Sequence, residues 1–294
     1  SPPLAFTFGL GALVIFPFRA GATSLLLESA PPPILLKEIA KHGVTTLFTA
    51  PTAYRAMLGH LPETAIPTLH TCVSAGEHLP KSTWEAWNSA TGIRIIDGIG
   101  ATEMLHIFIS AAGEEIIPGM TGKVVPGFEA IVVDDQLREV ADGEVGRLAV
   151  KGPTGCRYLQ DDRQRNYVEG GWNLTGDLYI KHSNGYFQYQ SRSDDMIISS
   201  GYNVAAPEVE NALLLHPSVG ECAVVGLPDE ERGMVVAAYV VLMNGFVGSD
   251  QLRKELQDHV KNQIAPYKYP RSIHFVDSLP KTTTGKLQRF RLKS

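Results

Sequence analysis

The chain has 294 residues, a net charge of −5 and 44% hydrophobic residues, which is enough apolar sequence for about two domains with sizeable cores. The acidic balance argues against a dedicated nucleic-acid binder. Cys72, Cys156 and Cys222 form no CxxC pair, which argues against a zinc site or a disulfide framework and fits a reducing, cytoplasmic location.

The apolar start of the chain, residues 1–27, has some features of a signal or membrane segment. It lacks a basic leader region, however, and Gly9, Pro17 and Arg19 interrupt it before 18 apolar residues accumulate. We therefore expect no membrane association. Because the chain opens in core-like sequence without Met, we also expect it to be the later part of a longer protein.

Residues 1–119 alternate helix and strand signals, the pattern of an α/β unit. Gly43 and Gly92 each follow an apolar-periodic segment and mark the end of a helix. The last strand of this region runs into a glycine-containing loop at 97–100, where α/β proteins place ligands. The expected helices cover residues 34–42, 52–58 and 80–90, and the expected strands cover 44–48 and 93–96.

The rest of the chain predicts two smaller units. Residues 120–190 carry short strands punctuated by Gly, Asp and Pro, which indicates a β-rich, barrel-like subdomain. Residues 195–294 indicate a small α+β C-terminal domain, in which Ser249 caps a helix whose apolar residues recur every four positions. The expected strands cover 124–125, 130–133, 145–150, 186–189, 223–225, 235–242 and 271–277, and a further helix covers 207–215.

Two familiar phosphate-binding patterns fail in this sequence. The glycine spacing of Gly119–Lys123 is wrong for GxxxxGK[ST], and Gly98–Glu103 ends in glutamate where GxGxxG needs glycine. Neither a P-loop NTPase nor a dinucleotide-binding fold is therefore supported.

The stretch Gly98–Glu103, GIGATE, offers different chemistry. Its glycines would let a flat or anionic ligand approach the backbone, Thr102 adds a hydroxyl, and Glu103 adds a hard oxygen ligand suited to Mg²⁺ beside phosphates. Taken alone, a strand-end turn with a surface glutamate is the simpler interpretation.

Two more motifs follow. Asp177, in Thr-Gly-Asp, could accept both hydroxyls of a ribose, although a tight turn is the simpler interpretation. Residues 191–210, SRSDDMIISSGYNVAAPEVE, are more specific: Arg192 could bind a ribose or phosphate with its planar fork, and Asp194 is a candidate hinge where the composition changes. The alternative for this stretch is a linker with a solvated charge pair.

Together, these motifs resemble the adenylate-forming enzymes, which include acyl-CoA synthetases, luciferases and peptide-synthetase adenylation domains. Ser74–Glu77 also resembles the turn of that family that contacts adenine. Stretches such as GIGATEMLHIFIS and SSGYNVAAPEVE are most similar to the aryl-CoA ligase branch, closest to 2-aminobenzoate-CoA ligases. The motifs in the order of the family are Gly98–Glu103, Thr175–Asp177, Arg192–Glu210 and Pro280–Arg289.

The resemblance implies an AMP-forming acid–thiol ligase that uses ATP, Mg²⁺ and coenzyme A. A carboxylate attacks the α-phosphate of ATP to give an acyl-adenylate, and the thiol of coenzyme A then displaces AMP. Thr102 would contact the α-phosphate, Glu103 would hold Mg²⁺, and Asp177 would bind the ribose hydroxyls with Arg192 assisting. The other residues implied to contact the nucleotide are Gly76, Glu77, Gly98, Ile99 and Gly100.

The resemblance also implies a small domain that turns between the two half-reactions. Asp194 would be its hinge, Gly201 would lie along the pantetheine tunnel, and Lys286 would meet the reacting carboxylate and phosphate. A lysine suits this step because two anions must approach one another, so that charge compensation dominates. The other tail cations, Arg289, Arg291 and Lys293, are interpreted as a solvated basic end.

An acyl pocket follows from the same resemblance. An apolar slot that contains Phe8 and Ile99 would suit a flat aromatic ring. Ordinary core packing would explain Phe8 and Ile99 as well. His106 is equally consistent with a core or surface histidine whose ring is hydrogen-bonded and that does not line a pocket. The residues implied to line the pocket are Thr7, Phe8, Gly9, Ile99, Gly100 and His106.

Three departures from the family pattern matter. Ile99 stands where many relatives stack a tyrosine on adenine, and Asn203 stands where many carry a cation. The family's Ser/Thr/Gly-rich loop that grips the β- and γ-phosphates does not occur in these residues. We therefore expect the C-terminal half of a large α/β domain with its β-rich subdomain, followed by the small α+β domain, and we expect it to be inactive alone.

Several alternatives stay open. Within the class they are a benzoate-CoA ligase and a medium-chain acyl-CoA synthetase, and outside it they are a non-catalytic nucleotide- or acyl-binding module and a basic-tail interaction protein. The net charge argues against the last, although residues 281–294 carry five basic side chains and no acids. The expected partners are an aromatic carboxylate, ATP and coenzyme A, without nucleic acid or membrane, and the resemblance is compatible with a homodimer.

Overall fold

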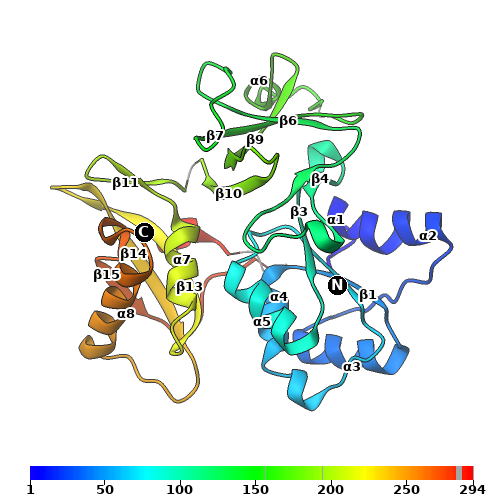
Figure 1. Cartoon of the computed structure of the whole chain (residues 1–294), viewed down its shortest axis with the longest axis horizontal. Helices are drawn as coiled ribbons and strands as arrows, with labels where there is room; N and C mark the ends of the chain where they lie inside the picture. Colours follow the sequence, from blue (N-terminus) through cyan, green and yellow to red (C-terminus); the bar gives the residue numbers. More distant parts are fainter. Residues whose placement is uncertain (156, 194, 283–286, 294) are drawn as a thin grey trace. The chain divides into compact units, whose positions relative to one another are not determined.

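The computed structural model describes residues 1–155, 157–193, 195–282 and 287–293 (Figure 1). The chain divides into two compact units, Ser1–Tyr189 and Gln190–Ser294. Each is described by itself below.

The first unit contains a five-stranded sheet in the order β1-β2-β3-β4-β5. The first three strands are parallel, so their carboxyl ends meet at the same edge of the sheet. The last two run antiparallel to their neighbours. The strands are β1 (Thr46–Thr49), β2 (Thr71–Ser74), β3 (Ile95–Gly100), β4 (Ile107–Ser110) and β5 (Lys123–Val124).

Three helices, α3 (Pro32–His42), α4 (Pro51–Leu58) and α5 (Lys81–Thr91), pack on one face of this sheet and share one apolar cluster with it. Tyr54 and Trp87 form its fully buried centre, with ring centroids 4.9 Å apart. The left-handed Gly43 (φ 61) ends α3 and Gly92 (φ 71) ends α5, as their sequence positions predict.

The opposite face of β1 carries the N-terminal helical segment. Leu47 belongs to the cluster beneath α3–α5, so the next residue, Phe48, points to the other face, where its ring meets that of Phe8. This segment consists of α1 (Thr7–Leu10), a π-helical turn (Gly11–Ile15) and α2 (Phe16–Ala20).

A second sheet in the first unit has the order β10-β9-β7-β6, with β8 paired to β9. It joins the first sheet through a bridge between Gly122 and Phe187 and through a shared core that contains Phe108 and Tyr179. The strands are β6 (Glu129–Val133), β7 (Val145–Lys151), β8 (Val168–Glu169), β9 (Trp172–Lys181) and β10 (Phe187–Arg192), and a short helix α6 (Arg163–Tyr167) precedes β8.

The second unit is an α+β sandwich of one sheet between two apolar layers. Helices α7 (Ala206–Leu214) and α8 (Asp250–Gln263) cover one face, and the C-terminal segment packs Leu279 and Leu292 on the other. Ser249 caps α8 by accepting the backbone N–H of Leu252, as predicted. The strands, in the order β12-β11-β14-β13 with β15 beside β14, are β11 (Ile197–Ser199), β12 (Tyr202–Val204), β13 (Val219–Asp229), β14 (Gly233–Leu242) and β15 (Ser272–Phe275).

The described residues also form five short 3₁₀ turns. They are Leu61–Glu63, Thr102–Met104, Gly113–Glu115, Pro266–Lys268 and Arg289–Leu292.

The mixed α/β and α+β fold class is confirmed. One local prediction is wrong: residues 97–100, expected as a loop, continue β3, where pairing with β4 overrides the turn preference of glycine. The Thr-Gly-Asp sequence lies within β9, but the register to β7 shifts there and Gly176 adopts φ 76, so a local turn interrupts the pairing at this point.

The solvated interpretation of the basic tail is also wrong for Arg289. Its guanidinium binds both carboxylate oxygens of Glu210, at 2.7 and 2.8 Å, and both side chains are mostly buried. Lys293 likewise pairs with Asp195 at 3.0 Å. Since Glu210 lies on α7, the ion pair ties the end of the chain back to the core of the second unit.

Replacing Glu210 with glutamine is expected to lower the stability of the second unit by about 1.5 kcal/mol. Glutamine keeps an oxygen for the Val224 backbone N–H, which Glu210 accepts at 2.8 Å, but leaves Arg289 without its counter-charge. Hydrogen exchange of β13 amides measures the change. Glu221→Gln, which removes the more exposed Lys281 pair, is the control and should cost less than about 1 kcal/mol; equal losses would contradict the assignment.

Candidate active site

The GIGATE stretch forms the end of β3 and the tip of the hairpin to β4. Register pairs Gly98 with Ser110 and Gly100 with Ile107, and Thr102–Met104 makes the 3₁₀ turn between the strands. A Cβ at Gly100 would lie 2.6 Å from the His106 carbonyl oxygen, and one at Gly98 would lie 2.8 Å from the Ile107 side chain. In this structure the glycines therefore make room for β4.

The tip of this hairpin is held in a fixed, partly strained conformation. Leu105 adopts φ 74°, unusual for a residue with a Cβ, and its N–H donates to the Thr102 carbonyl. The Thr154 hydroxyl donates to the Met104 carbonyl at 2.8 Å. Thr102 is exposed, so its hydroxyl is accessible to a ligand.

Glu103 is half-buried, and its carboxylate accepts a hydrogen bond from the loop after β7. The Tyr158 hydroxyl donates to Glu103 Oε1 at 2.6 Å. Among the described residues, no three His, Cys, Asp or Glu side chains gather as a metal site. A single hard carboxylate fits Mg²⁺ that arrives with nucleotide phosphates, because Mg²⁺ keeps waters and takes few protein ligands.

The turn after β2 lies beside this hairpin. Ser74 pairs in register with Asp97, so the neighbouring Gly76 and Glu77 follow β2 at the edge where β3 ends. Gly76 is exposed with φ 89°, and Glu77 accepts the Thr52 backbone N–H at 3.4 Å.

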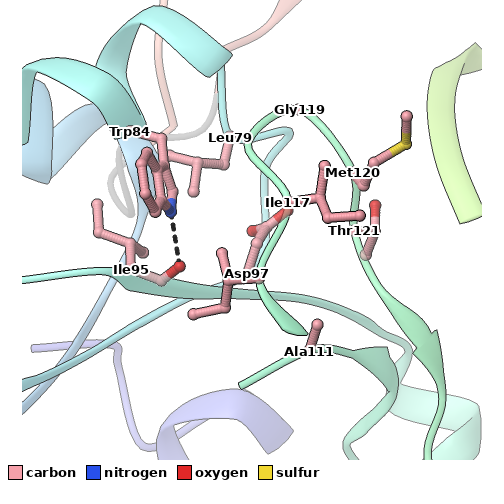
Figure 2. A pocket seen from close by; sticks show the side chains of 10 residues that line it. Leu79, Trp84, Ile95, Asp97, Ala111, Ile117, Gly119, Met120 and Thr121 are labelled. Carbon is pink, nitrogen blue, oxygen red and sulfur yellow. Dashed lines mark hydrogen bonds between the residues drawn. The ribbon is translucent and has the colours of Figure 1, made fainter. Parts of the chain in front are cut away.

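Asp97 lines a small cavity between β3 and the segment before β5 (Figure 2). The cavity measures about 10 Å³, room for roughly one water. Asp97 Oδ1 is shielded from solvent and has no hydrogen-bond partner in the described part of the chain. Burial raises the pKa of Asp97 to about 8, against the opposing interactions with the Gly98 backbone and the Ser74 side chain.

Asp177 comes to the same region from β9. Its N–H donates to the Thr175 hydroxyl at 3.1 Å. Nearby, Tyr179 shares a hydrogen bond of 3.3 Å with Thr121, and burial, with the negative charges of Asp177 and Asp97, raises the Tyr179 pKa. Tyr179, two residues after Asp177 on β9, belongs to the same buried cluster as Met104 and Phe108, so this part of β9 packs against the GIGATE hairpin.

An aromatic cluster packs around His106. Its ring lies 5.8 Å from that of Phe8 and 4.7 Å from that of Phe16, and a Cβ at Gly11 would meet it at 2.5 Å. Burial lowers the His106 pKa, against a hydrogen bond with the backbone of Phe8, so the ring is neutral near pH 7. The π-helical turn at Gly11–Ile15 shapes this contact.

The structure places the expected pocket residues in several different surroundings. Phe8 and His106 are in contact, whereas Ile99 packs against the core cluster that contains Met104 and Phe108. Gly9 is buried under the N-terminal backbone, since a Cβ there would lie 2.1 Å from the Pro3 carbonyl oxygen. Thr7 opens α1, and Gly100 abuts His106.

The remaining expected site residues belong to the second unit. Arg192 is exposed at the end of β10. Gly201 (φ 80) and Ser200 (φ 50) form the two-residue loop of the β11–β12 hairpin, a turn that requires positive φ at both positions. Asp194 and Lys286 lie outside the described residues.

Sequence reasoning missed Tyr158, Tyr179 and Asp97 as neighbours of the expected site. The hydroxyl of Tyr158 reaches Glu103 across 55 residues of chain, and a lone tyrosine in a loop carries no spacing signal. Asp97 directly precedes Gly98, so a charged residue at the end of an apolar strand was the available signal.

Comparison with known proteins identifies the class. Residues 1–158 match the AMP-binding enzyme family, and residues 208–286 match the AMP-binding enzyme C-terminal domain. The chain therefore belongs to the AMP-binding enzyme family, the adenylate-forming superfamily, and within it to the aryl-CoA branch.

Three relatives define the likeness more closely. The chain is 41% identical to the benzoate–CoA ligase of Thauera aromatica, over 99% of this chain and 56% of the relative. It is 39% identical to human mitochondrial acyl-coenzyme A synthetase ACSM2A, over 94% and 50%. The structure of the anthranilate CoA ligase AuaEII in complex with anthranoyl-AMP matches with a TM-score of 0.95 and 41% identity, over 99% of this chain and 58% of that one.

The chain thus spans about half the length of the curated relatives that it matches. In the part of the chain that the structure describes, none of the helices has the length and apolar character needed to cross a bilayer.

Proposed function

We propose that this chain is the C-terminal part of a cytoplasmic, ATP-dependent aryl-CoA ligase that prefers 2-aminobenzoate, the same acid as anthranilate. The enzyme first forms an acyl-adenylate and pyrophosphate, and it then transfers the acyl group to coenzyme A. The likeness to a ligase with bound anthranoyl-AMP supports this proposal, at 41% identity over nearly all of the chain.

Different residues of the first unit contact different parts of the nucleotide. Thr102 contacts the α-phosphate, Glu103 binds the Mg²⁺ that accompanies ATP, and Asp177 holds the ribose hydroxyls. The turn at Gly76 and Glu77 lies against the adenine. A bound Mg²⁺ neutralises the phosphate charge, and this chain's own part is to orient the groups around it.

The second unit supplies the groups whose positions differ between the two half-reactions. Lys286 compensates charge during adenylation, Arg192 assists at the ribose, and Gly201 lines the path of coenzyme A. Asp194 serves as the hinge. The boundary between the two compact units, Tyr189 to Gln190, lies four residues from Asp194 and supports a hinge there.

The observation that carries the aryl preference is the aromatic cluster at His106. Phe8 and Phe16 surround a neutral imidazole next to the hairpin that holds Glu103. Flat aromatic surfaces favour an aromatic acid, because ring contacts add about 0.5–1.5 kcal/mol beyond simple burial.

The loop that grips the β- and γ-phosphates belongs, in this proposal, to a preceding part of the same polypeptide. The first unit exposes several large apolar side chains within its first 34 residues, and exposed apolar surface of this kind, where it is contiguous, marks contact with further protein. These residues are Leu4, Phe6, Leu10, Ile15, Phe16, Phe18, Leu26 and Ile34. Burial beneath further protein would explain them, and the chain alone should then be inactive.

A carboxylate panel tests the function. The full-length protein is given ATP, Mg²⁺, coenzyme A and one acid at a time, and pyrophosphate release is measured. We expect both aromatic acids to exceed medium-chain fatty acids, because only the aromatic acids match the ring cluster. We expect 2-aminobenzoate to exceed benzoate because of the likeness to the anthranilate CoA ligase.

Each other outcome has a clear meaning. Preference for benzoate would indicate a benzoate-CoA ligase, and preference for a fatty acid would indicate a medium-chain acyl-CoA synthetase. Absence of release with every acid would leave a non-catalytic nucleotide- or acyl-binding module. Robust turnover by residues 1–294 alone would refute the upstream phosphate loop.

A further inference from the structure

Tyr158 occupies a position that the proposed reaction does not explain. It lies on the loop between β7 and α6, and its hydroxyl donates to Glu103 Oε1 at 2.6 Å, in the partly buried space beside the hairpin tip. Glu103 is the side chain that we propose for Mg²⁺, so Tyr158 donates a hydrogen bond directly to the proposed metal ligand.

The surroundings of Tyr158 fix where its hydroxyl points. Its backbone N–H donates to Gln164 Oε1 at 2.6 Å, and its ring meets that of Tyr167 edge-on, with centroids 6.1 Å apart. Both partners belong to α6, so the residue is held from its backbone and from its ring before any ligand arrives.

A second contact holds the same loop against the same turn. The Thr154 hydroxyl donates to the carbonyl oxygen of Met104, the residue after Glu103. The loop therefore crosses the hairpin tip with two hydrogen bonds, one to its backbone and one to its functional carboxylate.

The chemistry of the bond suits metal binding. A neutral phenol that donates to one carboxylate oxygen leaves the carboxylate charged and its other oxygen able to bind a cation. An unheld glutamate would rotate among several rotamers, and fixing them on binding costs free energy. Partners that orient a metal ligand in this way typically change metal affinity or activity about 10–100-fold.

We propose that Tyr158 is a positioning residue, which orients the Glu103 carboxylate for the Mg²⁺ that enters with ATP. This inference rests on the proposed function. It assigns Tyr158 a role in metal recognition as well as in packing.

The test measures how ATP binding to the full-length enzyme depends on Mg²⁺. Tyr158→Phe removes the hydroxyl and keeps the ring contact with Tyr167. We expect the Mg²⁺ concentration at half-saturation to rise about tenfold, whereas ATP affinity in EDTA stays within about twofold of the original protein. Calorimetry or a fluorescent ATP analogue provides this readout without turnover.

A matched control separates positioning from stability. Tyr186→Phe removes a hydroxyl with an equally short bond, 2.6 Å, to the carbonyl oxygen of Glu115. This variant should melt earlier yet keep the original Mg²⁺ midpoint. If Tyr158→Phe behaves in the same way, Tyr158 has only a structural role and the inference is overturned.

Two further variants keep the inference falsifiable. Gln164→Ala releases the backbone of Tyr158 without removing its hydroxyl, and it should raise the Mg²⁺ midpoint by a smaller factor, even if Tyr158→Phe does not fold. In a Glu103→Gln background, Tyr158→Phe should add nothing to the Mg²⁺ midpoint, since it acts through that carboxylate; an additive shift contradicts the inference.

Failure of the proposed function is distinguishable from failure of this inference. If the original enzyme shows no Mg²⁺-dependent ATP binding and releases no pyrophosphate, the proposed function fails. If it shows both and the tyrosine variant keeps its midpoint, only the role of Tyr158 fails.

Discussion

Replacing Lys286 with alanine is expected to slow acyl-adenylate formation by about 10²–10³-fold, with little effect on thioester formation from supplied acyl-adenylate. Adenylation brings a carboxylate anion to a phosphate anion, and a positive charge fixed at the point of attack stabilises the transition state. Loss of one such electrostatic partner costs about 2.7–4 kcal/mol, by analogy with an oxyanion donor. Thioester formation starts after pyrophosphate has left, so it depends less on that charge.

The two half-reactions are measured separately on the full-length enzyme. ATP–pyrophosphate exchange reports adenylation, and coenzyme A consumption with synthetic acyl-adenylate reports thioester formation. Arg291→Ala is the control, because it removes one exposed positive charge from the same tail and should change neither rate by more than about twofold. Equal losses in both half-reactions for Lys286→Ala would contradict its assigned role.

Local signals predicted the helix ends well. Gly43 and Gly92 end their helices in the left-handed conformation, and the Ser249 side chain caps α8. Each of these features depends on residues within one helical turn, so the sequence carries the information directly.

Strands that depend on distant partners were predicted less well. β13 runs over Val219–Asp229, whereas the sequence indicated only 223–225, because its outer residues include Glu221, Gly226 and Pro228, which suit a strand only when β14 lies alongside. Gly98 and Gly100 likewise look like loop residues until β4 fills the space beside them.

The candidate site shows the same difference between what local sequence predicts and what depends on distant partners. The sequence order of motifs indicated Glu103 and Asp177, but the residues that act on them come from remote parts of the chain. Tyr158 reaches Glu103, and Tyr179 lies near both Asp177 and Asp97. Arg289 was interpreted as solvated because its partner, Glu210, lies 79 residues earlier. Such contacts exist only once the sheets have assembled.

Replacing Asp97 with asparagine is expected to stabilise the first unit increasingly as the pH rises from about 4 to about 8. Burial raises the folded-state pKa of Asp97 from 3.8 to about 8. A raised pKa means that the favourable contribution of the protonated carboxyl is complete below the unfolded pKa and is lost as the pH rises through the folded pKa. Asparagine has no charge to bury, so it avoids that loss.

The expected size follows from the shift, reduced for partial exposure. Each pK unit corresponds to about 1.4 kcal/mol, but the residue is only half-buried although its Oδ1 is shielded, so we expect on the order of 2–3 kcal/mol between pH 5 and pH 9. Trp84, Trp87 and Trp172 all lie in the first unit, so fluorescence-detected urea unfolding at the two pH values reports on that unit.

Asp142→Asn is the matched control for this experiment. Asp142 is exposed in the turn between β6 and β7, so its substitution should shift stability by the same small amount at both pH values. A pH-independent effect of Asp97→Asn would mean that the carboxylate finds a compensating partner, such as a water in the adjoining cavity, and remains charged at neutral pH. Growth of the difference with pH would instead mean that the strand leading into the GIGATE hairpin carries a neutral carboxyl at pH 7.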